Sequence, residues 1–173
     1  MSGQGHGVFA DNPQYRAYQA LLKRLQDLNG AGLQDAPEAD AVRDQMEGVW
    51  YELTPPEQER LSGLCADLYS FSDEEPLGTP SPAEAAELRR GLAWCYQRCD
   101  WQRVLQLLRK GHHLFPKAAL AYARAHAWRE LGDAQVASWF LEQARALDPG
   151  HDQDEDSLET VFRADEPRRP SAG

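Results

Sequence analysis

Residues 98–116, RCDWQRVLQLLRKGHHLFP, are followed 33 positions later by residues 131–149, LGDAQVASWFLEQARALDP, which repeat the same pattern. The recurring positions are Asp100 as Asp133, Leu108 as Leu141, Gly111 as Ala144 and Pro116 as Pro149, with Leu92 and Val104 returning as Ala125 and Ala137. A period in the low thirties accommodates two helices and two turns, but not a strand–helix–strand unit with its loops. The stretch from Ser81 to Gly150 therefore predicts consecutive helical hairpins.

The second copy carries the clearer local signals. Gly132 lies in the turn Leu131-Gly132-Asp133, where glycine can adopt the left-handed conformation that closes a helix. The apolar positions that follow are spaced i, i+4 and i+7, which gives one stripe on the next helix. Pro149 cannot continue that helix and marks its end. The stripe consists of Ala137, Leu141 and Ala144.

This pattern resembles the tetratricopeptide repeat (TPR), a 34-residue motif. The matching positions in the second copy are Ala125, Trp128, Gly132-Asp133, Ala137, Leu141, Ala144 and Pro149. The first copy departs from the motif, because Cys95 stands where an aromatic residue is usual and Cys99 where glycine is usual. The resemblance implies two helical hairpins with a concave face that binds a peptide or a partner helix. The alternative is an ordinary helical bundle in which the sequence repeat is a coincidence.

The resemblance also implies which side chains line the concave groove. These are Arg89, Ala93, Tyr96 and Gln97 in the first copy, and Tyr122, His126, Arg129 and Glu130 in the second. Arginine binds carboxylates with two parallel hydrogen bonds and tyrosine offers rigid contact area, so we expect a partner with carboxylates beside apolar groups. The partner-binding candidates are Arg89, Tyr96, Gln97, Tyr122, His126 and Arg129. The alternative is that these are ordinary solvated side chains. The lysine–asparagine clamp that some family members use for a C-terminal carboxylate is absent.

Capping signals and composition divide the chain. We expect a mobile N-terminus over 1–11, three helices over 12–71, a linker over 72–82 and two TPR-like hairpins over 83–150. An acidic loop with a short capping helix over 151–164 and a disordered tail over 165–173 complete the prediction. The three N-terminal helices are predicted to begin at Asn12-Pro13, Asp35-Ala36-Pro37 and Thr54-Pro55-Pro56-Glu57. In the repeat region, we expect helices from Ser81, over Asp100–His113, over Lys117–Leu131 and over Asp133–Leu147.

The net charge of −10 argues against general nucleic-acid binding, which needs cations to displace phosphate counterions. The charge is uneven, because residues 84–149 hold ten Lys and Arg against seven Asp and Glu. This asymmetry could steer an acidic or amphipathic partner toward the repeats, or the acidic flanks could simply keep the protein soluble. A second hypothesis is that the acidic segment Asp152–Glu166 folds back onto the groove.

Composition also suggests a cellular setting. No apolar run approaches the length of a membrane span, and residues 1–11 do not read as a secretory signal. Three cysteines without framework spacing favour a reducing, cytoplasmic setting. Three lysines against 15 arginines favour a bacterial source. We expect a monomer or a weak homo-oligomer.

No catalytic motif is evident, so we expect no enzyme activity and no cofactor. Cys95 and Cys99, with His112-His113 nearby, lack a good zinc-site spacing, and no metal is expected. An exposed tryptophan among the five would be an interface candidate. The sequence thus predicts an all-α, TPR-like α-solenoid with a three-helix N-terminal segment, acting as a protein–protein adaptor or assembly factor. The alternatives are a dedicated chaperone or structural subunit for one partner and, less favoured, a small helical enzyme or metal-binding protein.

Overall fold

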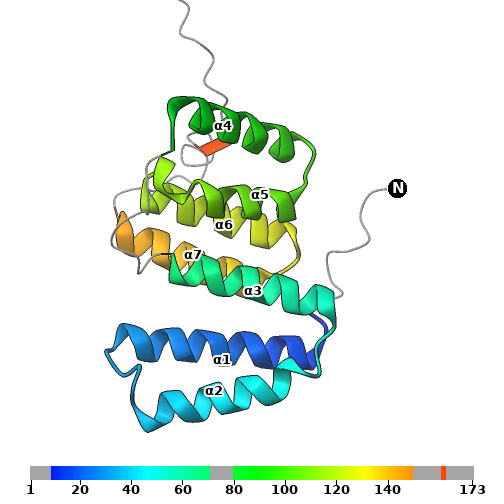
Figure 1. The fold of residues 1–173 in the computed structure, drawn as a ribbon, viewed down its shortest axis with the longest axis vertical. Coiled ribbons are helices and arrows are strands. Elements are labelled where there is room, and N and C mark those ends of the chain that lie inside the picture. The colour runs from blue at the N-terminus through cyan, green and yellow to red at the C-terminus, as the bar shows by residue number, and fades with distance from the viewer. Residues whose placement is uncertain (1–8, 71–79, 150–160, 163–173) are drawn as a thin grey trace, which may run out of the picture. The chain divides into compact units, whose positions relative to one another are not determined.

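The computed structural model describes residues 9–70, 80–149 and 161–162 (Figure 1). All regular secondary structure in these ranges is helical, which confirms the predicted all-α class. Contacts between residues divide the chain into two units, an N-terminal unit over Met1–Asp73 and a C-terminal unit over Glu74–Gly173. Each unit has its own helices and is described by itself.

The N-terminal unit contains α1 (Pro13–Gly30), α2 (Pro37–Trp50) and α3 (Pro55–Tyr69). Each helix begins with a proline in its first turn, where the missing N–H has no intrahelical role. α1 packs against both α2 and α3 and is therefore the central helix (Figure 1). Between α1 and α2 the buried side chains of Leu25, Ala39 and Val42 form a small core, extended by partly buried Leu21, Leu28 and Met46.

Polar contacts tie α3 to α1. Glu57 is 5% exposed, and its carboxylate accepts hydrogen bonds from the Asn12 side-chain amide (2.8 Å) and the Thr54 backbone N–H (2.9 Å). Burial alone would raise the pKa of Glu57, but the hydrogen bonds from Asn12 and Thr54 outweigh it and lower the pKa below its ordinary value. At the other end of the helix pair, the Gln26 side chain donates to the Leu68 carbonyl (3.2 Å).

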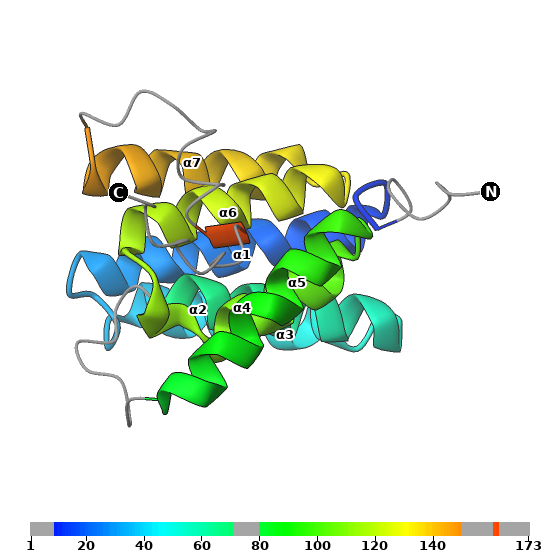
Figure 2. The same ribbon diagram turned by 90° about the horizontal axis from the view of Figure 1, so that it is seen from above.

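The C-terminal unit contains α4 (Pro82–Gln97), α5 (Trp101–Lys110), the 3-10 turn η1 (His112–Leu114), α6 (Lys117–Glu130) and α7 (Ala134–Leu147). Each helix packs against the next one along the chain, and α6 also contacts η1 (Figures 1 and 2). α6 and α7 form the most extensively packed pair in the unit. α5 ends at Lys110, three residues before the predicted end, and Gly111 separates it from η1.

The two hairpin turns of this unit share one geometry. Cys99 and Gly132, 33 positions apart, both have positive φ, at 56° and 86°. The residue after each donates its N–H back into the preceding helix, Asp100 to the Cys95 carbonyl and Asp133 to the Trp128 carbonyl, both at 3.0 Å. Each aspartate side chain then caps the following helix by accepting the N–H three residues on, at 3.2 Å and 3.3 Å. The sequence repeat is therefore a repeat of local structure at these turns.

Two apolar positions of the repeat, Leu92 with Ala125 and Val104 with Ala137, are buried in both copies. Leu92 and its counterpart Ala125 are 0% and 1% exposed, and Val104 and its counterpart Ala137 are 0% and 2% exposed. Gly111, the counterpart of Ala144, lies under Leu88, where an added Cβ would come within 2.6 Å of a Leu88 methyl. Leu92 and Val104 are larger than Ala125 and Ala137, whereas Gly111 is smaller than Ala144, so the two hairpins pack different side chains at matching positions.

Several expected segments lie mostly outside the described residues. They are residues 1–8 of the expected mobile N-terminus, residues 72–79 of the expected linker, residues 151–160 and 163–164 of the expected acidic loop and capping helix, and the expected tail over 165–173. Within the expected capping segment the structure describes Val161 and Phe162, which are helical and buried.

Candidate functional site

Four aromatic side chains from separate parts of the C-terminal unit meet in one cluster. The Tyr96 ring stacks on Phe162, with centroids 4.4 Å apart and planes at 25°. Trp101 meets Tyr96 edge-on at 5.5 Å and His126 edge-on at 5.0 Å. Tyr96 and His126 lie 6.0 Å apart. We call Tyr96, Trp101, His126 and Phe162 the aromatic cluster.

Local structure explains how the first three members come together. Tyr96 lies in the last turn of α4, and Trp101 is the first residue of α5, so the short turn between them brings the two rings close. His126 lies in α6, which packs against α5. The piece that carries Phe162, orange-red in Figures 1 and 2, lies beside α4 in the first view and beside α6 in the second. Two helices of the predicted groove, α4 and α6, therefore contribute to one aromatic surface.

Val161 and Phe162, which follow the last helix in the sequence, are buried, and Phe162 lies against this surface. Val161 is 1% exposed and Phe162 is 7% exposed. Burying each apolar side chain contributes about 1.5–3 kcal/mol, and the stacked ring pair adds about 0.5–1.5 kcal/mol. Ordering the backbone opposes this by about 1–2 kcal/mol per residue. The net stabilisation of the contact is therefore a few kcal/mol at most, which is small enough for a competing ligand to overcome.

The structure places the six candidate residues from the sequence in different local surroundings. Tyr96 and His126 come together in the aromatic cluster, whereas the Arg89 guanidinium lies 5.6 Å from the centre of the Phe115 ring. Tyr122 is 4% exposed and contributes to the core. Gln97 and Arg129 are exposed at the last residue of α4 and in the last turn of α6. Among the other groove positions, Ala93 is half-buried and Glu130 is exposed.

Two members of the cluster were missed from the sequence. Trp101 was not among the candidate groove residues, although it directly follows the Asp100 cap and therefore lies close to the end of α4. Phe162 was expected to cover the end of the helix stack, because Leu158, Val161 and Phe162 follow helical spacing. That spacing indicated an apolar face but carried no information about which helices it would meet.

A second surface lies on the α4–α5 hairpin. A groove of about 830 Å³ runs between the two helices, and it is lined by Pro80, Glu84, Glu87, Leu88, Gly91, Trp94, Cys95, Arg103, Leu107, Lys110 and His113. Trp94 is 58% exposed, and the Arg98 guanidinium stacks over its ring at 4.2 Å. All five tryptophans lie in described residues, and Trp94 alone is classed as exposed. We call this surface the α4–α5 groove.

Candidate metal ligands and the buried cysteine of the C-terminal unit bear on metal and thiol chemistry. No group of three or more His, Cys, Asp or Glu side chains within ranges 9–70, 80–149 and 161–162 could hold a metal ion. Burial, followed by the nearby Asp100 charge, raises the pKa of the Cys95 thiol, which makes it a poor nucleophile. Within the same ranges, no helix combines the length and apolar character needed to cross a membrane.

Comparisons with known proteins add no family to this picture. No family model matches the chain, and searches of curated proteins and of solved structures gave no significant match.

Proposed function

We propose that the C-terminal unit is a non-catalytic protein–protein interaction module, serving as an adaptor or assembly factor. It binds a peptide or helix of its partner on a TPR-like groove face, against Tyr96, Trp101 and His126. The stacking of Phe162 on Tyr96 carries this proposal, because it is an example of a separate segment placing an aromatic side chain on that face. Aromatic side chains set in a desolvated pocket are the usual energetic centres of such interfaces.

The chain's own segment indicates the chemistry of the partner. The sequence around Phe162 reads DQDEDSLETVFRADE over residues 152–166, which combines an aromatic residue with many carboxylates. Residues 84–149 carry an excess of basic side chains, including exposed Arg129. We infer that the partner likewise presents an aromatic anchor in an acidic segment, and that it takes the place of Phe162.

A fluorescent peptide with the sequence of residues 152–166 tests this proposal. Full-length protein carrying Phe162→Ala leaves the aromatic surface open, so it is expected to bind the peptide at least tenfold more tightly than the unchanged protein. In the unchanged protein, the attached segment competes at a high effective concentration. The matched controls are a peptide in which the phenylalanine is replaced by alanine, and the double variant Tyr96→Ala, Phe162→Ala.

Both controls are expected to weaken binding at least tenfold relative to the Phe162→Ala protein with the original peptide. Equal binding by the two peptides would show that carboxylates alone hold the ligand. Binding that survives Tyr96→Ala would place the ligand elsewhere. Either result would overturn the proposal, as would the failure of the Phe162→Ala protein to bind the peptide.

A further inference from the structure

The α4–α5 groove is an uncovered surface on the first helix of the C-terminal series. In the described part of this unit, α6 packs between α5 and α7, whereas α4 packs against α5. α4 has only two buried residues, Leu92 and Cys95, against nine in α6. End helices of repeat stacks normally carry polar outer faces. This one instead presents Trp94 and an apolar floor.

Gly91 lies at the middle of the groove and contributes no side chain to it. A Cβ added at Gly91 would come within 3.4 Å of a Leu107 methyl, so the glycine backbone lies close to α5 and presents no side chain of its own. Glycine in the middle of a helix is destabilising by about 0.5–1 kcal/mol relative to alanine, and it allows another backbone to approach closely. Gly91 therefore allows α4 to lie close to its own α5 and leaves this part of the groove without a side chain from α4.

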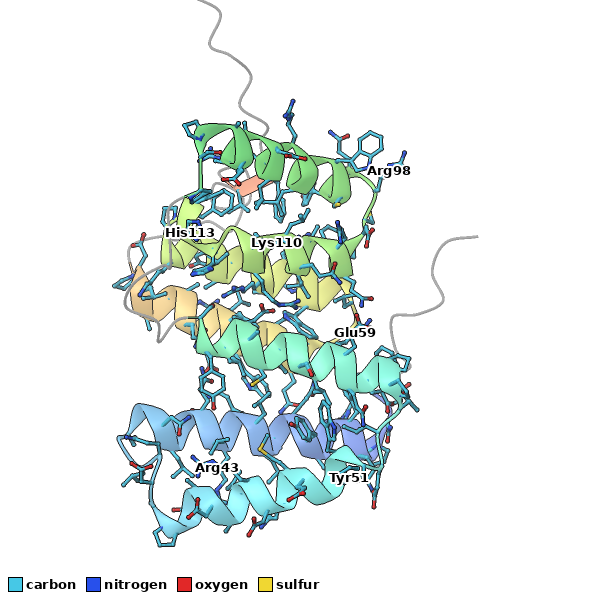
Figure 3. All side chains as sticks on the ribbon, viewed as in Figure 1. Arg43, Tyr51, Glu59, Arg98, Lys110 and His113 are labelled. Carbon is cyan, nitrogen blue, oxygen red and sulfur yellow. The ribbon has the colours of Figure 1, made fainter. Side chains whose placement is uncertain are left out.

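Charges are distributed unequally along the groove. Glu84 and Glu87 lie in the first half of α4, whereas Arg98 and Arg103 lie at the turn between α4 and α5. Figure 3 shows Arg98 at the turn end of the hairpin and His113 toward the opposite end. Lys110 and His113 also line the groove. The acidic end and the cationic end of the groove complement each other.

We propose that two copies of this chain associate through the α4–α5 groove, with their α4 helices antiparallel about a two-fold axis at Gly91. This axis places residues equally far before and after Gly91 opposite each other. Leu88 then faces Trp94 of the second copy, and Glu84 faces its Arg98. Gly91 lies beside Leu107 of α5 in its own copy. Glu87 is four residues before Gly91 and Arg103 is four residues before Leu107. The same axis therefore places Glu87 beside Arg103 of the second copy.

The self-complementary order of these groups favours a second copy over an unrelated helix. A two-fold interface uses the same patch twice, so every contact made by one copy is made again by the other. The antiparallel arrangement pairs acidic positions with cationic positions on both sides of Gly91. A parallel arrangement would place Glu84 near Glu84 and Arg98 near Arg98, which is repulsive. The exposed tryptophan supplies the apolar anchor.

Sedimentation velocity of the full chain between about 5 and 200 µM tests this proposal. The unchanged protein is expected to sediment increasingly as a dimer, and Gly91→Glu is expected to remain monomeric at all concentrations. Glutamate favours a helix interior more than glycine does, but its Cβ would lie 3.4 Å from a Leu107 methyl, so this variant has to be shown to stay folded. Circular dichroism checks that each variant keeps its helix content. Trp94→Ala is likewise expected to weaken association at least tenfold.

A charge exchange makes the register testable. Glu87→Arg alone and Arg103→Glu alone are each expected to weaken the dimer, and the double variant is expected to restore it. Both side chains are exposed in the monomer, and Glu142→Arg on exposed α7 surface serves as the control that leaves the dimer intact. A monomeric unchanged protein at 200 µM would overturn the proposal. So would a double variant weaker than both single variants, or a Glu142→Arg variant that is monomeric.

Discussion

The rings of Tyr96 and Phe162 stack with centroids 4.4 Å apart, although 66 positions separate the two residues in the sequence. Tyr96 belongs to the groove face expected from the repeat, and Phe162 belongs to a segment that follows the last helix of the repeat. This contact makes the aromatic cluster both a structural element of the C-terminal unit and the candidate binding surface. Its two roles lead to separate predictions.

Replacement of Phe162 by alanine is expected to lower the free energy of unfolding of the C-terminal unit by about 2 kcal/mol, because a side chain that is 7% exposed is lost with its stacked partner. Phe162→Leu keeps most of the apolar area and is expected to lose about half as much. Urea unfolding followed by tryptophan fluorescence measures both. Equal stability of all three proteins would mean that the contact contributes nothing.

Cys99→Gly is expected to stabilise the C-terminal unit by about 0.5–1 kcal/mol. Cys99 has φ of 56°, a conformation unfavourable to residues with a Cβ by about 1–2 kcal/mol, and glycine removes this penalty at a smaller entropic cost. The reciprocal change at the equivalent turn, Gly132→Ala, is expected to destabilise by about 1 kcal/mol. Thermal unfolding of both variants measures the difference, and the same sign of change at both turns would contradict their equivalence.

The two capping aspartates are expected to differ in strength. Loss of a helix cap by substitution with alanine costs about 0.5–2 kcal/mol. Asp100 is exposed and Asp133 is 6% exposed, so Asp100→Ala should fall at the low end of this range and Asp133→Ala at the high end. Denaturant unfolding of each variant tests the order. A larger loss from Asp100→Ala would show that burial does not strengthen this cap.

The stability of the N-terminal unit is expected to vary with pH because of Glu57. Its folded-state pKa is lowered because hydrogen bonds from Asn12 and Thr54 outweigh the effect of burial. The ionised carboxylate therefore stabilises the fold above its ordinary pKa, and this contribution is lost as the pH falls through the lowered value. Amide hydrogen exchange in α1 and α3 between about pH 7 and 3 should show this loss of stability. In Glu57→Gln, the decrease in stability with falling pH should be smaller. An unchanged slope in Glu57→Gln would contradict the assignment.

Local sequence signals predicted the helices well because each one carries its own start and stop. Ser81 and Glu84 form a capping box at the start of α4, and prolines open all three helices of the N-terminal unit. The left-handed turn was predicted only at Gly132, whereas Cys99 departs from the repeat motif and adopts the matching positive φ nonetheless. The caps and the glycine turn depend on a few neighbouring residues, so a single sequence is enough to recognise them.

The candidate site was harder to predict because its contacts are distant in sequence. The resemblance to the TPR implied that Tyr96 and His126 lie on one groove, but it also assigned Tyr122 to that groove, although Tyr122 is buried. Phe162 meets Tyr96 across 66 positions of sequence, and no local pattern predicts such a contact. Likewise, exposure of Trp94 follows from the uncovered side of α4, which no local pattern reveals.

The indole N–H signal of Trp101 in nitrogen-15 NMR spectra tests the central claim most directly, because this ring touches Tyr96 and His126. Phe162→Ala should shift the Trp101 signal, and addition of the peptide covering residues 152–166 should return it toward its position in the unchanged protein. Trp94, in the separate α4–α5 groove, serves as the internal control and should not move. A Trp101 signal that is insensitive to both changes, or a peptide that moves only Trp94, would contradict binding at the aromatic cluster.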